Sequence, residues 1–236
     1  MSFRELDAGE IIRTIERLSE RVEARFPGSG LSSVSRDFLG LSRDAAREAD
    51  ALGTPNWTIR VGVGIVIVTM VATAVVALTR AFNAFGQAAE SFGAAEMFQT
   101  IESLINDIVF LGIAVFFLAT IESRIKRRKA LERLHQLRSV AHIVDMHQLT
   151  KDPDNLFEEP NGESVPPVRP MTRDELARYL DYCGELLSLT GKMAALFVQR
   201  FSDSLVLRSV NEIEDLTTGL SRKIWQKITL LGTVSR

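Results

Sequence analysis

All three histidines of this chain lie in one short stretch, "LHQLRSVAHIVDMHQLTKDP" (134–153), which also contains Asp145. Imidazole and carboxylate groups bind metal ions, and imidazole changes its charge near neutral pH. On a helix, His135 and His142 share a face but lie two turns, about 10 Å, apart, and His147 points roughly a third of a turn away. The stretch favours a local hydrogen-bonded pair of His142 and Asp145. The alternative is a metal- or proton-responsive site that uses all four residues.

Other patterns that carry chemistry are incomplete in this sequence. "LTGK" (189–192) has the Gly-Lys pair of a phosphate loop but lacks its upstream glycine and its following Ser or Thr. The single cysteine, Cys183, falls on an apolar helical face and has no histidine at a spacing that suggests a dyad. A net charge of −2 gives no basic field for nucleic acid. We therefore expect no enzymatic activity, no cofactor and no nucleic-acid partner.

Two apolar stretches predict membrane-spanning helices, at 57–80 and 105–122. Val61–Thr79 has no charged residue and, as a helix, would be roughly 28 Å long, close to the thickness of the hydrocarbon layer. In the second stretch, Asn106 and Asp107 fall about one turn inside the outer boundary. A carboxylate within the membrane is a candidate functional group, for example in a pore. The alternative is that Asp107 is solvated at the level of the lipid headgroups.

Small residues and the connecting segment give further expectations for this hairpin. Glycines can let another helix approach closely, and the apolar stretches contain Gly62, Gly64 and Gly112. Residues 81–104 between the stretches are acidic and aromatic. This segment predicts either an amphipathic helix at the membrane surface or an outward extension of the second span.

Basic residues predict the orientation. The sequence "RIKRRK" directly follows the second apolar stretch, whereas 81–107 has no Lys or Arg. The positive-inside rule then places both termini in the cytoplasm of a bacterial inner membrane. The basic side chains are also expected to contact anionic lipid. They are Arg124, Lys126, Arg127, Arg128 and Lys129.

The rest of the chain reads as amphipathic helices. An N-terminal hairpin is expected at 1–56, a juxtamembrane helix at 123–150 and a C-terminal helical hairpin at 172–236, with a proline-rich linker at 151–171. "TRDE" (172–175) is a capping box. The apolar stripes, each on one helical face, are Ile11, Ile15, Leu18 and Val22; Leu31, Val34, Phe38, Leu41, Ala45 and Leu52; Leu131, Leu134, Leu137, Ala141 and Val144; Leu176, Leu180, Cys183, Leu187, Ala194 and Val198; and Val206, Val210, Ile213, Leu220, Ile224 and Leu231.

These observations predict an all-α protein: a two-span transmembrane hairpin with cytoplasmic amphipathic helices. Each stripe needs a neighbouring helix or a neighbouring subunit, which favours a homo-oligomer and leaves room for a helical protein partner besides the lipid bilayer. The expected function is that of a membrane scaffold or effector, whose cytoplasmic helices control assembly of the hairpin into, for example, a pore. In layout the chain resembles the two-helix membrane effectors of bacterial conflict systems, such as the SLATT type. The alternative function is a metal- or proton-responsive membrane sensor.

Overall fold

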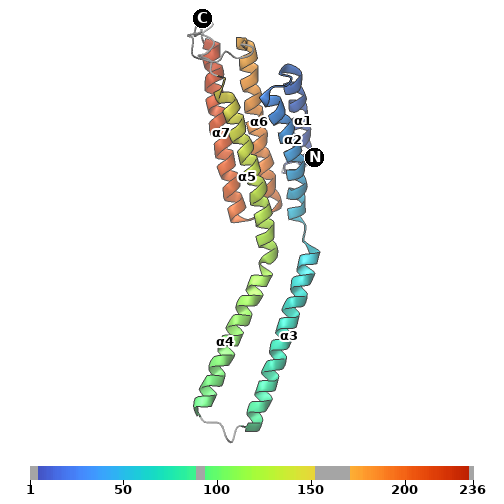
Figure 1. The fold of residues 1–236 in the computed structure, drawn as a ribbon, viewed down its shortest axis with the longest axis vertical. Helices are drawn as coiled ribbons and strands as arrows, with labels where there is room; N and C mark the ends of the chain where they lie inside the picture. The colour runs from blue at the N-terminus through green and yellow to red at the C-terminus, as the bar shows by residue number, and fades with distance from the viewer. Residues whose placement is uncertain (1–4, 89–93, 152–170, 234–236) are drawn as a thin grey trace. The chain divides into compact units, whose positions relative to one another are not determined.

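A computed structural model of the chain describes residues 5–88, 94–151 and 171–233. All regular secondary structure in these ranges is α-helix (Figure 1). The chain divides into two compact units. Unit 1 consists of residues 1–54 and 127–236, and unit 2 consists of residues 55–126. The predicted all-α class is confirmed. Most of the predicted proline-rich linker, 152–170, lies outside the described residues.

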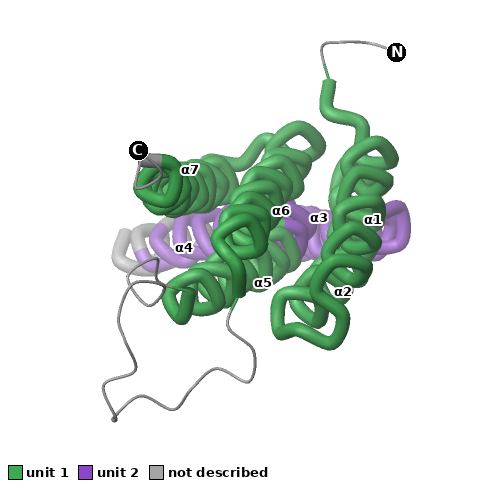
Figure 2. Tube along the Cα trace, turned by 90° about the horizontal axis from the view of Figure 1, so that it is seen from above, with its two compact units in different colours: residues 1–54, 127–236 green, residues 55–126 purple. Residues whose placement is uncertain are grey.

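Unit 1 is a helical bundle arranged around one central helix. Its helices are α1 (Ala8–Arg25), α2 (Gly30–Gly53), the part of α5 (Ile121–Leu149) from Arg127 onward, α6 (Arg173–Arg200) and α7 (Ser204–Thr233). In Figure 2, α6 lies in the middle of this unit, with α1 and α2 on one side and α7 on the other. Contacts of α6 with α1, α2 and α7 account for most of the packing between helices. The three predicted cytoplasmic segments thus form one bundle.

Local signals set the ends of these helices. The Asp7 side chain accepts hydrogen bonds from the first turn of α1, and the Ser29 hydroxyl caps α2. Between these helices Gly28 has φ = 68°, a left-handed conformation that glycine adopts readily. The predicted capping box at the start of α6 is present: Thr172 and Glu175 each accept a hydrogen bond from the other's backbone N–H.

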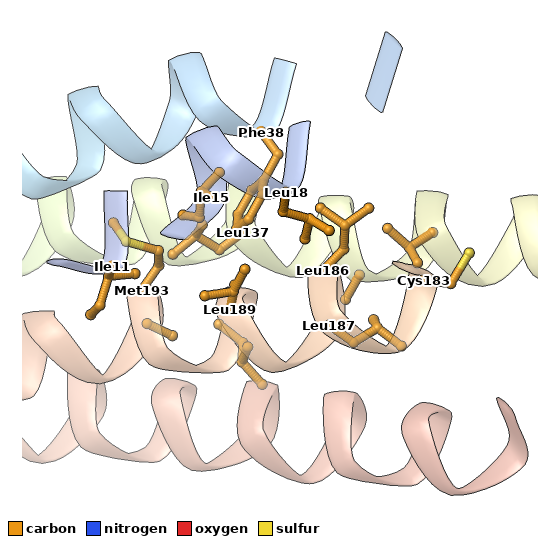
Figure 3. Close-up of a cluster of buried hydrophobic side chains, with 14 of the residues drawn as sticks. Ile11, Ile15, Leu18, Phe38, Leu137, Cys183, Leu186, Leu187, Leu189 and Met193 are labelled. Atoms are coloured by element: carbon orange, nitrogen blue, oxygen red, sulfur yellow. The ribbon is translucent and has the colours of Figure 1, made fainter. Parts of the chain in front are cut away.

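The predicted apolar stripes form the core of unit 1. Every stripe residue of α1 and α7 is buried, and so are most of those on α2 and α5. Figure 3 shows Leu18, Phe38 and Leu137, from three different helices, converging above the side chains of α6. The stripes are therefore covered by neighbouring helices of the same chain.

The prediction for α6 was too narrow, because this helix is buried on more than one face. The buried residues outside the predicted stripe include Tyr179, Tyr182, Leu186, Leu189, Met193, Leu196 and Phe197. A helix at the centre of a bundle has neighbours on several sides, so a single amphipathic stripe cannot describe it. Phe26 of the α1–α2 connection packs edge-to-face on Tyr179 and Tyr182, at centroid distances of 5.4 and 6.2 Å.

Unit 2 consists of α3 (Trp57–Ala88), α4 (Ala94–Ala119) and the first residues of α5. The predicted connecting segment 81–104 is therefore largely helical: α3 continues to Ala88, and α4 begins at Ala94. For residues 94–104 this agrees with an extension of the second apolar helix. The segment 89–93 lies outside the described residues.

Candidate functional site

The apolar helices of unit 2 expose large hydrophobic side chains along their length. On α3, Ile65 and Val68 are 62% and 67% exposed, and on α4, Phe110 and Phe116 are 70% and 68% exposed. None of the described residues of α3 or α4 is buried. Judged by length and composition over the described residues, one helical stretch, which includes α3 up to Arg80, could cross a membrane. The number rises to two if Ile105–Ala119 and the following α5 count as one broken span.

The polar and small residues predicted to matter in these helices lie open to their surroundings. Asn106 and Asp107 are exposed on α4. A Cβ atom added at Gly62, Gly64 or Gly112 would meet nothing within 4 Å. These glycines do not mediate the packing of α3 on α4 within one chain. Contact between helices of different chains at these positions stays a prediction.

A charged cluster that the sequence did not predict joins the open end of the α3–α4 hairpin. The carboxylate of Glu122 accepts a hydrogen bond from Arg60 Nε at 2.6 Å and one from the backbone N–H of Asn56 at 3.1 Å. Lys126 Nζ lies 3.1 Å from the same carboxylate, whose side chain is only 14% exposed. Glu122 follows the interruption at Thr120 between α4 and α5. The cluster therefore ties the beginning of α3 to the chain that leaves α4.

The five basic residues after the second apolar helix have different environments. The Arg124 guanidinium lies 4.8 Å from the centre of the Phe117 ring, and Lys126 pairs with Glu122. The Arg127 guanidinium contacts Asp203 at 2.7 Å in unit 1, whereas Arg128 and Lys129 are exposed. Arg128 and Lys129 therefore present their charge to the surroundings, and Arg127 directs its charge to a carboxylate of the bundle.

Helix α5 is fastened to α7 by polar contacts at a nearly constant sequence offset. Arg127 bonds to Asp203, Arg138 bonds to Glu212 at 3.3 Å, and Lys227 Nζ donates to the Gln148 carbonyl at 3.3 Å. The offset of 74 to 79 residues means that the two helices run parallel. Helix α5 also contacts α2, because the Arg133 guanidinium donates two hydrogen bonds of 2.8 Å to Glu48.

These ion pairs shift the acidity of two carboxyl groups. The hydrogen bond from Arg133 lowers the pKa of Glu48 despite the opposing effect of burial. Burial alone would raise the pKa of Asp203. The hydrogen bonds from Arg127 and from the backbone N–H groups of Val206 and Leu205 outweigh burial and lower that pKa. Both side chains are therefore held as carboxylates that join α5 to its neighbours.

The structure does not gather the predicted histidine cluster into one site. His135 and His142 are exposed on α5, and His147 lies half-buried beside Gly30. The carboxylate of Asp145 accepts a hydrogen bond from Gln148 at 2.7 Å, and within the described ranges no hydrogen bond joins it to His142. In the same part of the chain, no three His, Cys, Asp or Glu side chains lie close enough together to hold a metal ion.

No family model matches this chain, and neither a curated protein nor a solved structure is significantly similar to it. The functional argument therefore depends on the exposed apolar surface of unit 2, on the charged cluster at Glu122, and on the contacts of α5.

Proposed function

We propose that this chain is an integral protein of a bacterial inner membrane, with both termini in the cytoplasm. Its role would be that of a non-enzymatic, oligomeric scaffold or effector. Helices α3 and α4 would form a hairpin in the bilayer, and the bundle of unit 1 would control the association of such hairpins. An assembled ring of hairpins could enclose a pore, with Asp107 at its outer mouth.

The observation that carries this proposal is the exposed apolar surface of α3 and α4. Burial of one large aliphatic or aromatic side chain contributes about 1.5–3 kcal/mol. More than a dozen such side chains are exposed on these two helices, while the stripes of unit 1 are covered. Contiguous apolar surface of this extent is rare on a monomer in water, and it is what a lipid-facing helix requires.

Charge supports the proposed orientation. The open end of the hairpin carries Arg60, Arg124 and Lys126, which is the pattern of a cytoplasmic membrane boundary. The other end has the acidic residues Glu102 and Asp107 and no basic residue between 81 and 107. The Glu122 cluster would then lie at the cytoplasmic boundary, where Arg60 and Lys126 compensate its charge.

Helix α5 is the element through which the bundle could control the hairpin. It begins one residue after α4, and its first residues belong to unit 2. From Arg127 onward it is bonded to α7 and to α2. A change in the bundle that moves α5 would therefore act on the chain that leaves α4.

Membrane fractionation tests the location. The full-length protein, expressed in bacteria, is expected to stay in the membrane pellet after an alkaline carbonate wash. Placing Lys at both Ile65 and Val68 should impair insertion, because each costs about 2.5–3.5 kcal/mol at the centre of a span. Ile143→Lys is the matched control, since Ile143 is an exposed apolar residue of unit 1 and its change should leave fractionation unaltered. Release of the wild-type protein by carbonate would refute the proposal.

Two measurements test the assembly. Light scattering of the detergent-solubilised protein should give a mass of more than one chain, and a monodisperse monomer would contradict the scaffold. Liposomes containing the protein should show ion flux that Asp107→Asn alters more than Glu102→Gln does. An absence of flux with the wild-type protein would remove the pore and leave the scaffold.

A further inference from the structure

We propose that a second copy of this chain docks on the outer face of α7, with the two α7 helices antiparallel about a two-fold axis close to Thr218. The α7 face is defined by Glu214, Asp215, Thr218, Arg222 and Trp225, which are all exposed. The inference deepens the proposed function, because it names the interface through which the cytoplasmic bundles of a membrane-bound oligomer would associate.

The first argument is the order of charges along the α7 face. Asp215 and Arg222 are two turns apart and differ by only about 20° around the helix, so they lie on one line. Glu214 adds a second acidic group on the side of Asp215. Among the described residues, neither Asp215 nor Arg222 takes part in an ion pair. One end of the face is therefore acidic and the other basic, and both ends lack a charged neighbour.

An antiparallel second copy matches this order of charges. A two-fold axis between Thr218 and Gly219 places Asp215 of each chain opposite Arg222 of the other, so one pair of residues gives two ion pairs. A parallel arrangement in register would instead set like charges against each other. The same order does not suit a strongly anionic or cationic partner, such as nucleic acid, because one end of the face would repel it.

The second argument is the shape of the face. The centre of the contact consists of small side chains, and a Cβ atom at Gly219 would meet nothing within 4 Å. Two helix axes can then approach to about 8–10 Å. Near one end of the face, Trp225 is 69% exposed, and it lines a hollow of about 830 Å³ together with Ser188 and Lys192 of α6.

An exposed tryptophan beside a hollow on the same surface suits an interface between identical chains. Each copy offers both a projecting ring and a recess, and a two-fold axis brings each projection to the other copy. Tryptophan is among the residues that contribute most to binding when an interface covers it. The α7 face therefore combines an aromatic anchor, complementary charges and a close-packing centre.

A charge-swap experiment on the full-length protein in detergent tests this interface, with the mass measured by light scattering. Asp215→Arg and Arg222→Asp should each weaken association by about tenfold or more, since each turns two attractive pairs into two repulsive ones. The double variant D215R/R222D should restore association. An equimolar mixture of the two single variants should also restore it, as a mixed species in which both pairs are attractive again. Trp225→Ala should weaken association without altering the helical circular dichroism.

Cysteine cross-linking provides an independent measurement. Thr218→Cys lies near the proposed two-fold axis, so two copies should form a disulfide with each other under a mild copper oxidant. His142→Cys, on the exposed surface of α5, is the matched control and should not form one. The natural Cys183 is buried and should not contribute.

The outcomes separate the two proposals. If the wild-type protein is oligomeric but neither charge reversal nor Thr218→Cys has the expected effect, the α7 interface is overturned and the scaffold stands. If the wild-type protein is a monomer, both are overturned. Restoration by the double variant and by the mixture of single variants supports the α7 interface specifically.

Discussion

Breaking the bidentate ion pair between Glu48 and Arg133 should loosen the attachment of α5 to α2. Arg133 Nε and Nη2 each donate a hydrogen bond of 2.8 Å to one carboxylate oxygen of Glu48. The perturbation is a set of three variants: Glu48→Gln, Arg133→Met and the double variant. Gln keeps the shape of Glu48 without its charge, and Met keeps much of the apolar stem of Arg133.

The exposure of the two side chains limits the size of the effect. They are 25% and 35% exposed, so solvent screens part of the attraction, and a surface ion pair contributes up to about 1 kcal/mol. The bidentate geometry places this pair at the upper end of that range, about 1 kcal/mol of coupling between the two positions. For a domain of this size, 1 kcal/mol corresponds to a change in Tm of about 2–4 °C.

The pH dependence gives this prediction its sign. Because Arg133 lowers the pKa of Glu48 below its usual 4.5 in the folded protein, the ion pair stabilises fully above pH 4.5. Its contribution is lost as pH falls through the lowered pKa of the folded state. The difference in Tm between wild type and Glu48→Gln should therefore be constant from pH 7 to about pH 5 and should shrink in more acidic solution.

Thermal unfolding of the full-length protein in detergent, followed by circular dichroism at 222 nm, measures both effects. A thermodynamic cycle over the three variants isolates the coupling. Arg43→Met, which removes an exposed pair with Glu16, is the control and should lower Tm less. A coupling near zero, or a Tm difference that grows as the solution becomes more acidic, would refute the argument that this pair joins α5 to α2.

Three further changes test the packing of unit 1. Gly30→Ala should lower the free energy of unfolding by about 1–3 kcal/mol, because a Cβ atom there would overlap the His147 ring, and a second change, His147→Ala, should recover part of the loss in a thermal melt. Leu137→Ala should cost about 2–5 kcal/mol, since the side chain is fully buried, and an unchanged Tm would contradict its place in the core. Burial raises the pKa of the Cys183 thiol to about 12, so at pH 8 alkylation should require denaturant, and rapid modification of the native protein would contradict this burial.

The helices and most of the core could be predicted from sequence, because both depend on local patterns. A helix repeats every 3.6 residues, so spacings such as Ile11, Ile15, Leu18 and Val22 identify the buried face directly. Caps and breaks such as the box at Thr172 act within a few residues. Burial of the other faces of α6 depends on how many helices surround it, which is a property of the tertiary arrangement.

The candidate sites were harder to predict, because their contacts join residues far apart in the chain. Arg133 and Glu48 are separated by 85 positions, and Arg60 and Glu122 by 62, so sequence spacing gives no signal for either pair. The expected pair of His142 and Asp145 was plausible by spacing alone. Gln148, three residues after Asp145, is within equal reach and provides the hydrogen bond to its carboxylate.

The two units satisfy their apolar residues in different ways, and this difference supports the proposed division of labour. In unit 1 each stripe is covered within the chain, so the outer surface is free to carry ordered charges such as those of the α7 face. In unit 2 the apolar surface is left for lipid or for other hairpins, which are non-directional neighbours. Specific association of hairpins would therefore have to be encoded mainly in unit 1, where Asp215 and Arg222 can select a matching copy. Helix α5 is the one described helix whose residues belong to both units, so it is the element through which that selection would reach the hairpin.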